Sequence, residues 1–441
     1  MNHKSPGRNK LVRYALSMLT AVVAILLGWG AAVAAFFGVG FVTAAIPVLL
    51  GAAMFGGFLV SWAAVRMIAG FMRLPRARWV ATGGAAAGTA ALLLVASFIV
   101  LRPLPSTPEA RQAMEPPARV QYWTLATGST VAVLEIPAGG PPRSAPIVVV
   151  GGGPGEGNVA DRSLTGFFER FAALGYDVYF YDQIGSGLSE RLSNPAEYTV
   201  ARHVADLDAL RQRIAADRMI LLGSSWGGSL VASYLARHPG RVDCAIFTSP
   251  APIDYAQWRD TDTGSPSSRL PPRQRQEADA LLPGSPRFIL WYLLGGINPR
   301  AAHNLISDQE ADSYFSTYLH LVAPAMVCDP ANLPTDPMTG YGLYDNVFTV
   351  RDARSGGQNQ VRDALADDPT PSLILTGPCN YVPWEVTRQY RTTLPNSALV
   401  CLPNSGHVIY LDQPKPYFDT IRSFLLDQPL PVPPWTSTQP C

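Results

Sequence analysis

The sequence predicts an α/β fold, a mostly parallel sheet with helices on both faces, preceded by three transmembrane helices. The first hundred residues are apolar, with long stretches free of formal charge. From about residue 118, short apolar runs alternate with amphipathic stretches, as in a parallel sheet joined by crossover helices. Residues 251–367 interrupt this alternation and are rich in Pro and aromatic side chains. We therefore expect a cap over the carboxyl edge of the sheet, where ligands bind in such folds.

The N-terminal region contains two uncharged stretches. The 52 residues between Arg13 and Arg66 and the 23 residues between Arg78 and Arg102 carry no formal charge. A bilayer crossing takes about 20 apolar residues, so the longer stretch predicts two spans with a break near residues 38–40. The three expected spans lie at about 14–36, 42–64 and 79–101. A cleaved signal peptide before a buried helical domain is the alternative, but signal apolar regions are only about 7–15 residues long.

Basic residues predict the orientation of these spans. Residues 1–108 hold nine basic and no acidic side chains, and the basic ones gather before the first span and between the second and third. Because such segments stay in the cytoplasm, three crossings put the rest of the chain on the extracytoplasmic side. No ionisable residue lies within the spans, which favours an anchor over a transporter.

The remainder of the chain is mildly acidic, with 25 basic and 33 acidic side chains. A nucleic-acid partner would require a basic face on the folded part, so we expect none. The five cysteines form no CxxC pair, and this disfavours a zinc site or a thioredoxin-like redox site. One disulfide fits an exported domain, and we expect Cys244 and Cys401 to be core residues on strands.

Apolar runs predict eight strands. The runs lie at Val120–Leu125, Val131–Ile136, Ile147–Val150, Asp177–Tyr181, Met219–Leu222, Ala245–Phe247, Leu373–Leu375 and Leu399–Leu402. The first two form a hairpin, and helices are expected at about 160–174, 200–215, 227–238, 384–394 and 414–426. The expected organisation is an anchor at 1–102, a Pro-rich linker at 103–117, a core at 118–250 and 368–428, a cap at 251–367 and a Pro-rich tail at 429–441.

The strongest chemical motif is Gly223–Gly227, which reads GSSWG and fits G-x-S-x-G. It follows a predicted strand and precedes a predicted helix, the context in which a sharp turn exposes a nucleophilic serine. Ser225 is therefore the expected nucleophile. The amide of Trp226, at a helix N-terminus, is expected to face the oxyanion that develops during acyl transfer.

A glycine run at Gly151–Gly155 follows the strand Ile147–Val150. It permits close approach of the backbone to a substrate oxygen, and we assign the second oxyanion donor to the amide of Gly153, with Gly152 as the alternative. A phosphate-binding turn is disfavoured because no P-loop lysine follows and GxGxxG is not matched.

His407 lies just past the last predicted strand and is the expected general base, with an ordinary surface histidine as the alternative. In a catalytic triad with the chain order Ser, acid, His, the acid is expected after the strand Leu373–Leu375. Asn380 occupies this position in the sequence. An amide oxygen can orient the imidazole but does not stabilise its charged form. Asp254 is the alternative acid, and we favour Asn380 as the orienting residue.

These motifs, with Tyr181–Ser189 (YDQIGSGLS) and Gly406-His407, resemble the proline iminopeptidase family of α/β hydrolases over about residues 118–428. The resemblance implies release of an N-terminal residue, often proline, from peptides, without a metal or cofactor. The family usually has His at the position of Gly151 and Asp at that of Asn380, and the membrane spans are not part of its common pattern. The family's cap also supplies acidic side chains that hold the free amino end, and the segment around Glu310 resembles one of these with a shifted spacing; a solvated helix face is the other interpretation of Glu310.

Three functions are thus in competition. The first is an extracytoplasmic exopeptidase that acts on small peptides. The second is a carboxylesterase or lipase at the membrane surface, suggested by the anchor and by the cap aromatics Trp258, Trp291 and Tyr292. The third is a binding protein with weakened catalysis, suggested by Asn380. The expected partners are a small peptide or ester substrate and the lipid bilayer.

Overall fold

The computed structural model describes residues 6–71, 77–112, 114–258, 264–334, 340–355 and 359–441. The chain folds into two compact units. The first comprises Met1–Leu104 and Ser285–Ser307, and the second comprises Pro105–Gly284 and Asp308–Cys441.

The second unit is built on a sheet that has eight strands in the described residues, in the order β1-β2-β4-β3-β5-β6-β7-β8. The strands are β1 (Gln121–Thr124), β2 (Thr130–Ile136), β3 (Ile147–Val150), β4 (Val178–Tyr181), β5 (Met219–Ser224), β6 (Val242–Thr248), β7 (Ser372–Thr376) and β8 (Ser397–Cys401). β1 pairs with β2 and β2 with β4 in antiparallel register, whereas the pairs from β4 to β8 are parallel. Each predicted run forms a strand, and the mostly parallel α/β fold is confirmed.

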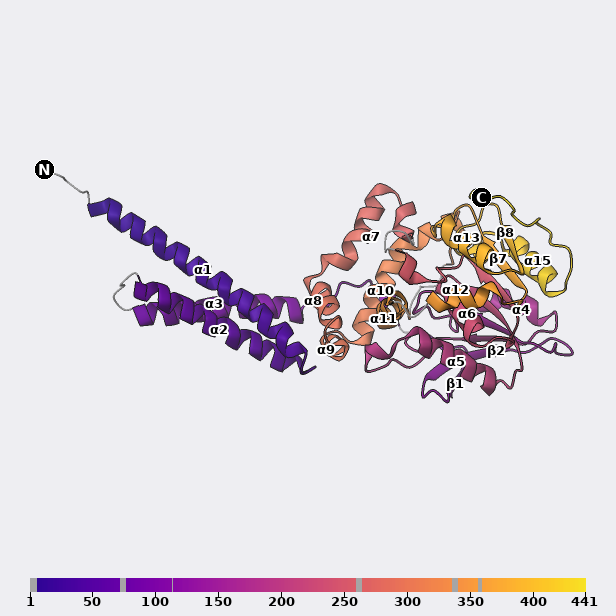
Figure 1. The fold of residues 1–441 in the computed structure, drawn as a ribbon, viewed down its shortest axis with the longest axis horizontal. Coiled ribbons are helices and arrows are strands. Elements are labelled where there is room, and N and C mark those ends of the chain that lie inside the picture. Colours follow the sequence, from indigo (N-terminus) through magenta and orange to yellow (C-terminus); the bar gives the residue numbers. More distant parts are fainter. Residues whose placement is uncertain (1–5, 72–76, 113, 259–263, 335–339, 356–358) are drawn as a thin grey trace. The chain divides into compact units, whose positions relative to one another are not determined.

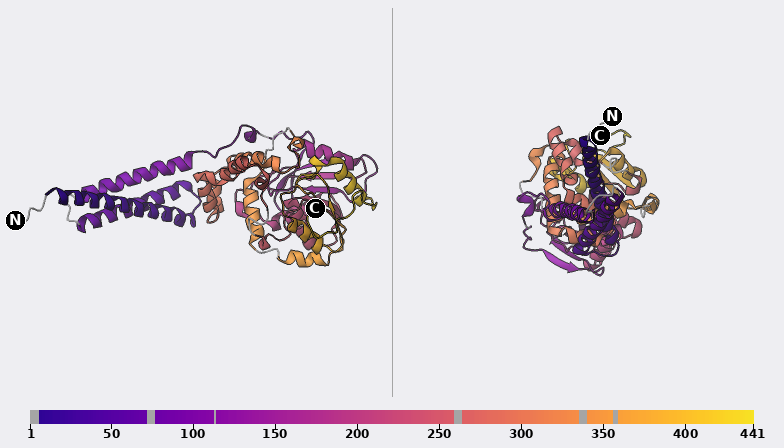
Figure 2. Two further views of the ribbon diagram at one scale, coloured as in Figure 1. Left: turned by 90° about the horizontal axis from the view of Figure 1, so that it is seen from above. Right: turned by 90° about the vertical axis from the view of Figure 1, so that its left-hand side faces the viewer.

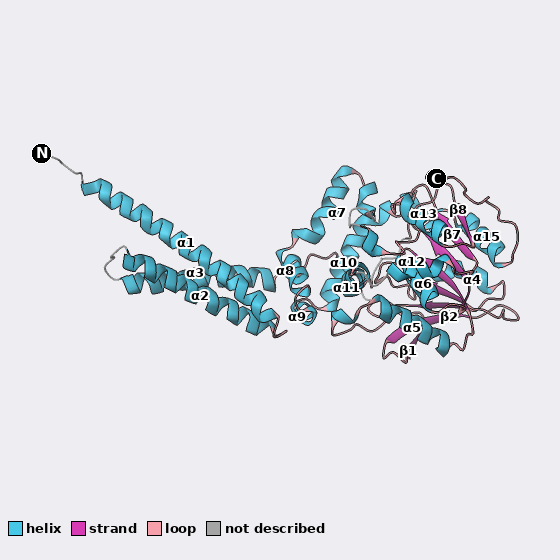
Figure 3. Cartoon of the chain, viewed as in Figure 1, coloured by secondary structure: helices cyan, strands magenta, loops and turns pink. Residues whose placement is uncertain are grey.

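Helices cover both faces of this sheet (Figures 1 and 3). Successive side chains of a strand point to opposite faces, so Val148 and Val150 of β3 pack into one apolar cluster while Ile147 and Val149 pack into the other. The first cluster draws on α5 (Val200–Arg213), α6 (Trp226–Arg237), α12 (Asn359–Ala366) and α13 (Trp384–Thr393). The second draws on α4 (Arg162–Ala172), α14 (Ile409–Asp412) and α15 (Pro414–Leu425).

The insertion after β6 supplies helices to both units. α7 (Pro272–Gly284), α10 (Asp308–Val322) and α11 (Leu343–Arg354) belong to the second unit, whereas α8 (Pro286–Gly295) and α9 (Pro299–Leu305) belong to the first. Short 3-10 turns occur at Glu109–Arg111, Pro195–Glu197, Tyr255–Gln257, Pro266–Arg269, Ala323–Ala325 and Pro330–Asn332.

The first unit contains three long helices that run side by side in Figures 1 and 2. They are α1 (Pro6–Gly40), α2 (Ile46–Phe71) and α3 (Ala77–Leu101). α1 and α2 meet through small residues: a Cβ atom added at Gly57 would lie 3.2 Å from both the Ala32 Cβ and the Gly28 carbonyl oxygen. The Ser61 hydroxyl donates to the Ala24 carbonyl at 3.3 Å. Small residues and a buried hydroxyl are typical of helix pairs that pack in lipid.

Two segments of the described residues, Ala21–Gly40 and Ile46–Met67, are long and apolar enough to cross a membrane by length and composition. The apolar part of α3, Ala86–Val100, is shorter, so the predicted count of three spans is not confirmed. Lys4, Arg73 and Arg76, which contribute to the predicted orientation, lie outside the described residues.

Four of the five cysteines form disulfides, Cys328–Cys379 and Cys401–Cys441. Cys244 is free and buried on β6, as expected. The expectation that Cys401 is an unpaired core residue is wrong. It lies on β8, which is an edge strand of the sheet, so its half-buried side chain is reached by the C-terminal tail.

Candidate active site

Ser225 occupies the turn between β5 and α6 in a strained conformation, with φ 52° and ψ −121°. The glycines on either side make this turn sterically feasible. A Cβ atom at Gly223 would collide with the Gly227 backbone, and one at Gly227 would collide with the Val150 carbonyl oxygen. Ser225 is partly exposed, so the turn presents its hydroxyl to a substrate, as a strand–turn–helix elbow does.

The glycine run after β3 lies directly beside Ser225. A Cβ atom at Gly152 would come 3.1 Å from the Ser225 Cβ. The Gly152 amide donates to Oε2 of Glu156 at 2.6 Å, so a carboxylate occupies this donor in the structure. Gly153 is exposed and has φ +100°. The run therefore brings Gly152 next to Ser225, with the Gly152 amide already engaged, while the role of Gly153 as an oxyanion donor stays a prediction.

Gln183 connects the glycine run to the nucleophile turn. Its Nε2 donates to the Gly151 carbonyl at 2.9 Å, and its Oε1 accepts from the Trp226 indole at 3.2 Å. The buried Asp182 carboxylate accepts from the amides of Asn158 and Leu188 at 2.6 and 2.7 Å. The string Tyr181–Ser189 thus fixes the backbone around the candidate oxyanion site through two adjacent side chains.

His407 is buried, at 5% exposure, and its Nδ1 lies 2.9 Å from Oδ1 of Asn380. The structure therefore brings Asn380, rather than the alternative Asp254, to this imidazole nitrogen. Asp254 is itself fully buried just after β6.

The orientation of the Asn380 amide follows from its other neighbours. Oδ1 accepts from the Val382 amide at 3.1 Å, and a backbone N–H can only donate. Nδ2 faces the Thr376 hydroxyl at 3.4 Å. Oδ1 therefore points at His407 as an acceptor, so Nδ1 carries the proton and the unprotonated nitrogen is Nε2.

Tyr381 contacts the Nε2 side of His407. The two rings have centroids 4.3 Å apart, and the Tyr381 hydroxyl lies 3.3 Å from Nε2. Burial raises the pKa of Tyr381 well above its ordinary value, against a lowering by its hydrogen bond with the Ser225 side chain. The Tyr381 hydroxyl therefore lies beside both Nε2 of His407 and the Ser225 side chain.

Burial lowers the pKa of His407 to about 3. A neutral imidazole is ready to accept a proton, but its charged form gains little stabilisation because Asn380 supplies a dipole and not a charge. The arrangement has the geometry of an acid–base pair and a weaker electrostatic drive than a Ser-His-Asp triad.

Asp412 joins the loop that carries His407 to a segment of the cap. Oδ2 of Asp412 accepts from the amides of Gly406 and Cys328, both at 2.7 Å. Cys328 is bonded to Cys379, the neighbour of Asn380. One cap segment therefore braces both the histidine loop and the Asn380 loop.

Glu310 lies in the first turn of α10, and its predicted role in substrate binding stays a prediction. Another acidic residue of α10, Asp312, has a side chain that is 15% exposed and pairs with Arg191 at 2.9 Å. Burial raises the pKa of Asp312 to about 6.

Glu156 has an unusual electrostatic environment. Burial raises its pKa to about 7, the Gly152 hydrogen bond opposes this, and the charges of Asp161 and Asp182 raise it further. A carboxyl group that titrates near neutral pH beside a candidate nucleophile is typical of functional sites.

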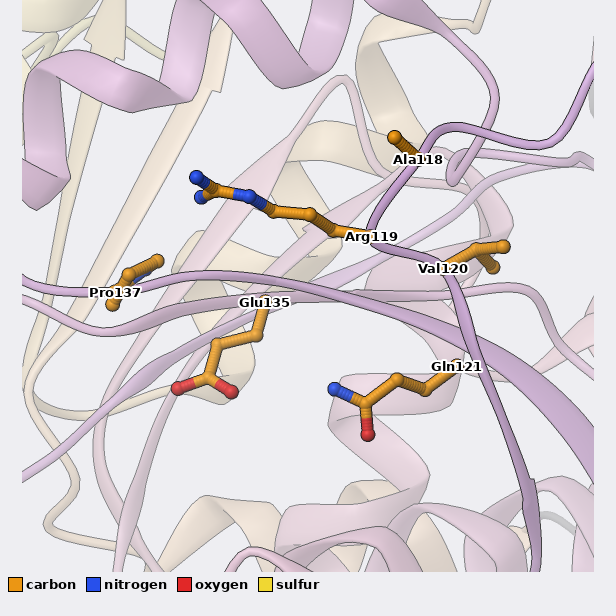
Figure 4. A pocket seen from close by; sticks show the side chains of 6 residues that line it. All are labelled: Ala118, Arg119, Val120, Gln121, Glu135 and Pro137. Atoms are coloured by element: carbon orange, nitrogen blue, oxygen red, sulfur yellow. The ribbon is translucent and has the colours of Figure 1, made fainter.

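A surface pocket lies away from these residues. It is lined by Ala118, Arg119, Val120, Gln121, Glu135 and Pro137, at the β1–β2 edge of the sheet (Figure 4). None of the candidate catalytic residues lines it, so this pocket is separate from the candidate active site. Within the described ranges, no group of three or more His, Cys, Asp or Glu is arranged to hold a metal ion.

Three residues of this site are not predicted from the sequence. Gln183 stands out there only as part of a family string, Tyr381 only as a neighbour of Asn380, and Glu156 not at all. Glu156 could have been identified as a site residue from its position next to the glycine run. Nothing in the sequence shows where the Tyr381 hydroxyl lies.

Comparisons with known proteins agree with the fold. A family described as the alpha/beta hydrolase fold matches residues 145–284. A proline iminopeptidase of Heyndrickxia coagulans is 26% identical over 286 residues, which cover 64% of this chain and 90% of that protein. A proline iminopeptidase of Levilactobacillus brevis is 25% identical over 294 residues, with 64% and 88% covered.

Among solved structures, an esterase from Exiguobacterium antarcticum superimposes with a TM-score of 0.50 at 18% identity, covering 69% of this chain and 98% of that one. The chain has the α/β-hydrolase fold, and the sequence comparisons support a hydrolase.

Replacing Glu156 with Gln is expected to stabilise the protein at alkaline pH. The pKa of Glu156 is raised from 4.5 to about 7, so the folded protein retains a proton that the unfolded chain loses within this window. Stability due to this group therefore falls as pH rises from 4.5 to 7 and stays low above it. At pH 8.5, the Glu156→Gln variant should have a higher melting temperature than the wild type, with an unfolding free energy that is greater by on the order of 1–3 kcal/mol. At pH 5, the two proteins should melt at nearly the same temperature. Melting curves at both pH values measure this, and an equal difference at both would contradict the raised pKa.

Proposed function

We propose that the chain is a membrane-anchored serine hydrolase that releases N-terminal residues from peptides through an acyl-enzyme on Ser225. The observation that carries the proposal is the Asn380–His407 pair, with Nδ1 of the imidazole 2.9 Å from an acceptor and Nε2 directed to a hydroxyl that is hydrogen-bonded to Ser225. This arrangement supports the proposal, because nucleophilic catalysis uses a base near the nucleophile and a third group that orients the base. The similarity to proline iminopeptidases supports the peptidase class.

In the first step, Ser225 Oγ attacks the substrate carbonyl and its proton passes to Nε2 of His407, with the Tyr381 hydroxyl as the link in the resting enzyme. The amides of Trp226 and Gly153 stabilise the oxyanion. His407 then protonates the leaving amine, the C–N bond breaks, and an ester on Ser225 remains. Water attacks this ester with His407 again as base, which releases the acid and restores Ser225.

Glu156 suits the role of partner for the free amino end of such a substrate. Its carboxylate lies on the Gly152 amide beside Ser225. An ammonium group next to it would lower its pKa from about 7, because an opposite charge favours the ionised form. Binding of the substrate's ammonium group would then keep Glu156 ionised, although burial disfavours its charge in the free enzyme. Glu310 is the second candidate for this role.

The anchor and its orientation belong to the same proposal. Two long apolar helices and the basic residues that flank them support a multi-pass protein with a cytoplasmic N-terminus. The proposal takes α3, whose apolar part is shorter, as a third crossing, which puts the chain after Leu101 outside the cytoplasm. Two disulfides fit an oxidising compartment outside the cytoplasm. The hydrolase domain would therefore act on extracytoplasmic peptides.

A panel of chromogenic substrates tests the peptidase class. Purified full-length protein should cleave Pro and Ala arylamides with a free amino group and should not cleave their N-acetylated forms. Glu156→Gln should raise KM for the free-amine substrates by about tenfold, the effect of losing about 1.4 kcal/mol of charge pairing, and should leave KM for neutral acyl esters unchanged. The matched variant Glu310→Gln separates the two candidate carboxylates.

Cleavage of acyl esters alone, without arylamide turnover, would reject the peptidase and favour the carboxylesterase or lipase. If Glu310→Gln alone raised KM for free-amine substrates, the ammonium partner would be Glu310 and not Glu156.

Asn380 and the low pKa of His407 favour a second candidate function, a binding protein with weakened catalysis. An Asp at position 380 would place a negative charge at Nδ1 and raise the pKa of His407. We expect Asn380→Asp to raise kcat by about tenfold or more, since the opposite change in a serine protease lowers kcat by about 10⁴. The acid limb of kcat/KM against pH should also move to higher pH, because catalysis needs neutral His407.

Asp254→Ala serves as the comparison for this variant and should retain most of the activity if the protein remains folded. Loss of activity in Asp254→Ala, with none in Asn380→Ala, would show that Asp254 and not Asn380 supports His407.

A further inference from the structure

The α8–α9 hairpin, Ser285–Ser307, lies about 180 residues after α3 in the sequence, yet it packs with the long N-terminal helices in one compact unit. Asn298 Nδ2 donates to the Gly40 carbonyl at 2.9 Å, and Asn304 Nδ2 donates to the Ala44 carbonyl at 3.0 Å. Gly40 is the last residue of α1, and Ala44 lies in the connection between α1 and α2. The hairpin is therefore attached to one defined end of the two apolar helices, as Figures 1 and 2 show.

Apolar packing supports this attachment. A Cβ atom at Gly40 would lie 3.4 Å from Cδ1 of Leu294 and 3.9 Å from Cγ2 of Ile297. The absence of a side chain at Gly40 thus allows α8 to contact the end of α1 directly.

The opposite face of α8 is apolar as well, although it is exposed. Trp291 and Leu294 are buried, whereas Ile289, Tyr292 and Leu293 are 47%, 48% and 51% exposed. The exposed three follow an i, i+3, i+4 pattern and therefore share one side of the helix. A helix at a water-facing surface carries polar residues on that side, so water is a poor environment for this face.

The connection that α8 and α9 contact is apolar and exposed too. Phe41 and Val42 are 71% and 86% exposed. Together with the exposed face of α8, they extend the apolar surface of the two candidate spans beyond the helix end at Gly40.

The charges of the α8–α9 hairpin indicate which environment suits its exposed apolar face. Residues 285–307 contain no Asp or Glu and two Arg, Arg287 and Arg300. Arg287 donates to the Leu305 carbonyl at 2.7 Å within the hairpin, whereas Arg300 is exposed. An exposed Arg, an exposed Tyr and an apolar helix face at the end of the candidate spans match the headgroup region of a bilayer, where aromatic side chains gather and anionic lipids attract Arg.

We propose that the exposed face of α8 docks into the bilayer interface at the extracytoplasmic ends of α1 and α2. The hairpin is inserted in the chain between α7 and α10, so the cap is tied to the lipid surface by a contact of its own, separate from the linker after α3. The proposal rests on the proposed membrane anchoring, and it does not depend on the reaction at Ser225.

An environment-sensitive fluorophore on single cysteines introduced into the full-length protein tests this contact in nanodiscs of phosphatidylcholine and phosphatidylglycerol. Leu293→Cys reports the docking face, Leu26→Cys, on an exposed position of α1, reports a span, and Arg388→Cys, exposed on α13, reports an aqueous surface. The parent protein gives the labelling background, since its free Cys244 is buried.

The label at position 293 should emit at shorter wavelength than the label at 388, lose most of its intensity to a nitroxide lipid labelled near the headgroup, and resist aqueous iodide. The label at 26 should respond most to a nitroxide deep in the acyl chains.

A label at 293 that iodide quenches as strongly as at 388 would overturn the docking proposal, provided that the label at 26 is lipid-exposed. Protection from iodide without lipid quenching would assign the face to protein, for instance a second copy of the chain, and would overturn it equally. If the label at 26 is also water-exposed, the anchoring itself fails.

Discussion

The hydrogen bond between Nδ1 of His407 and Oδ1 of Asn380 is the interaction on which the rest of the site depends. It fixes the tautomer of the imidazole and leaves Nε2 facing the Tyr381 hydroxyl, and it does so without a negative charge. The turn at Ser225 and the hydrogen bonds of Gln183 position the candidate nucleophile and the glycine run, but they supply no base. Burial lowers the pKa of His407, and the Asn380 amide supplies no negative charge that would raise it again.

Much of the fold was predictable because strands buried on both faces give continuous apolar runs. Ile147–Val150 and Met219–Leu222 could be identified for this reason, and the helices between them followed from the chain lengths that parallel strands require. Ser225, Asn380 and His407 follow β5, β7 and β8, and parallel strands end at one sheet edge, so the sequence predicts that these residues gather there. The structure pairs Asn380 with His407 at 2.9 Å, while the catalytic roles of the three residues stay predictions.

Other features depend on contacts that no local pattern encodes. The engagement of the Gly152 amide by Glu156 follows from how the glycine run folds back, and the place of the Tyr381 hydroxyl depends on the ring packing against His407. The pairing of Cys401 with Cys441 required a tail that crosses an edge strand. The division of the cap between two units depends on contacts between residue 40 and residue 298, across more than half of the chain.

Labelling with a fluorophosphonate, which reacts covalently with an activated serine, tests the central claim most directly. The measurement compares the labelling rate of detergent-purified wild-type protein with that of Ser225→Ala. If the Asn380–His407 pair activates Ser225, the wild type becomes labelled and the variant does not. A folded wild-type protein that stays unlabelled, or a variant labelled at the same rate, would contradict the assignment of Ser225 as an activated nucleophile.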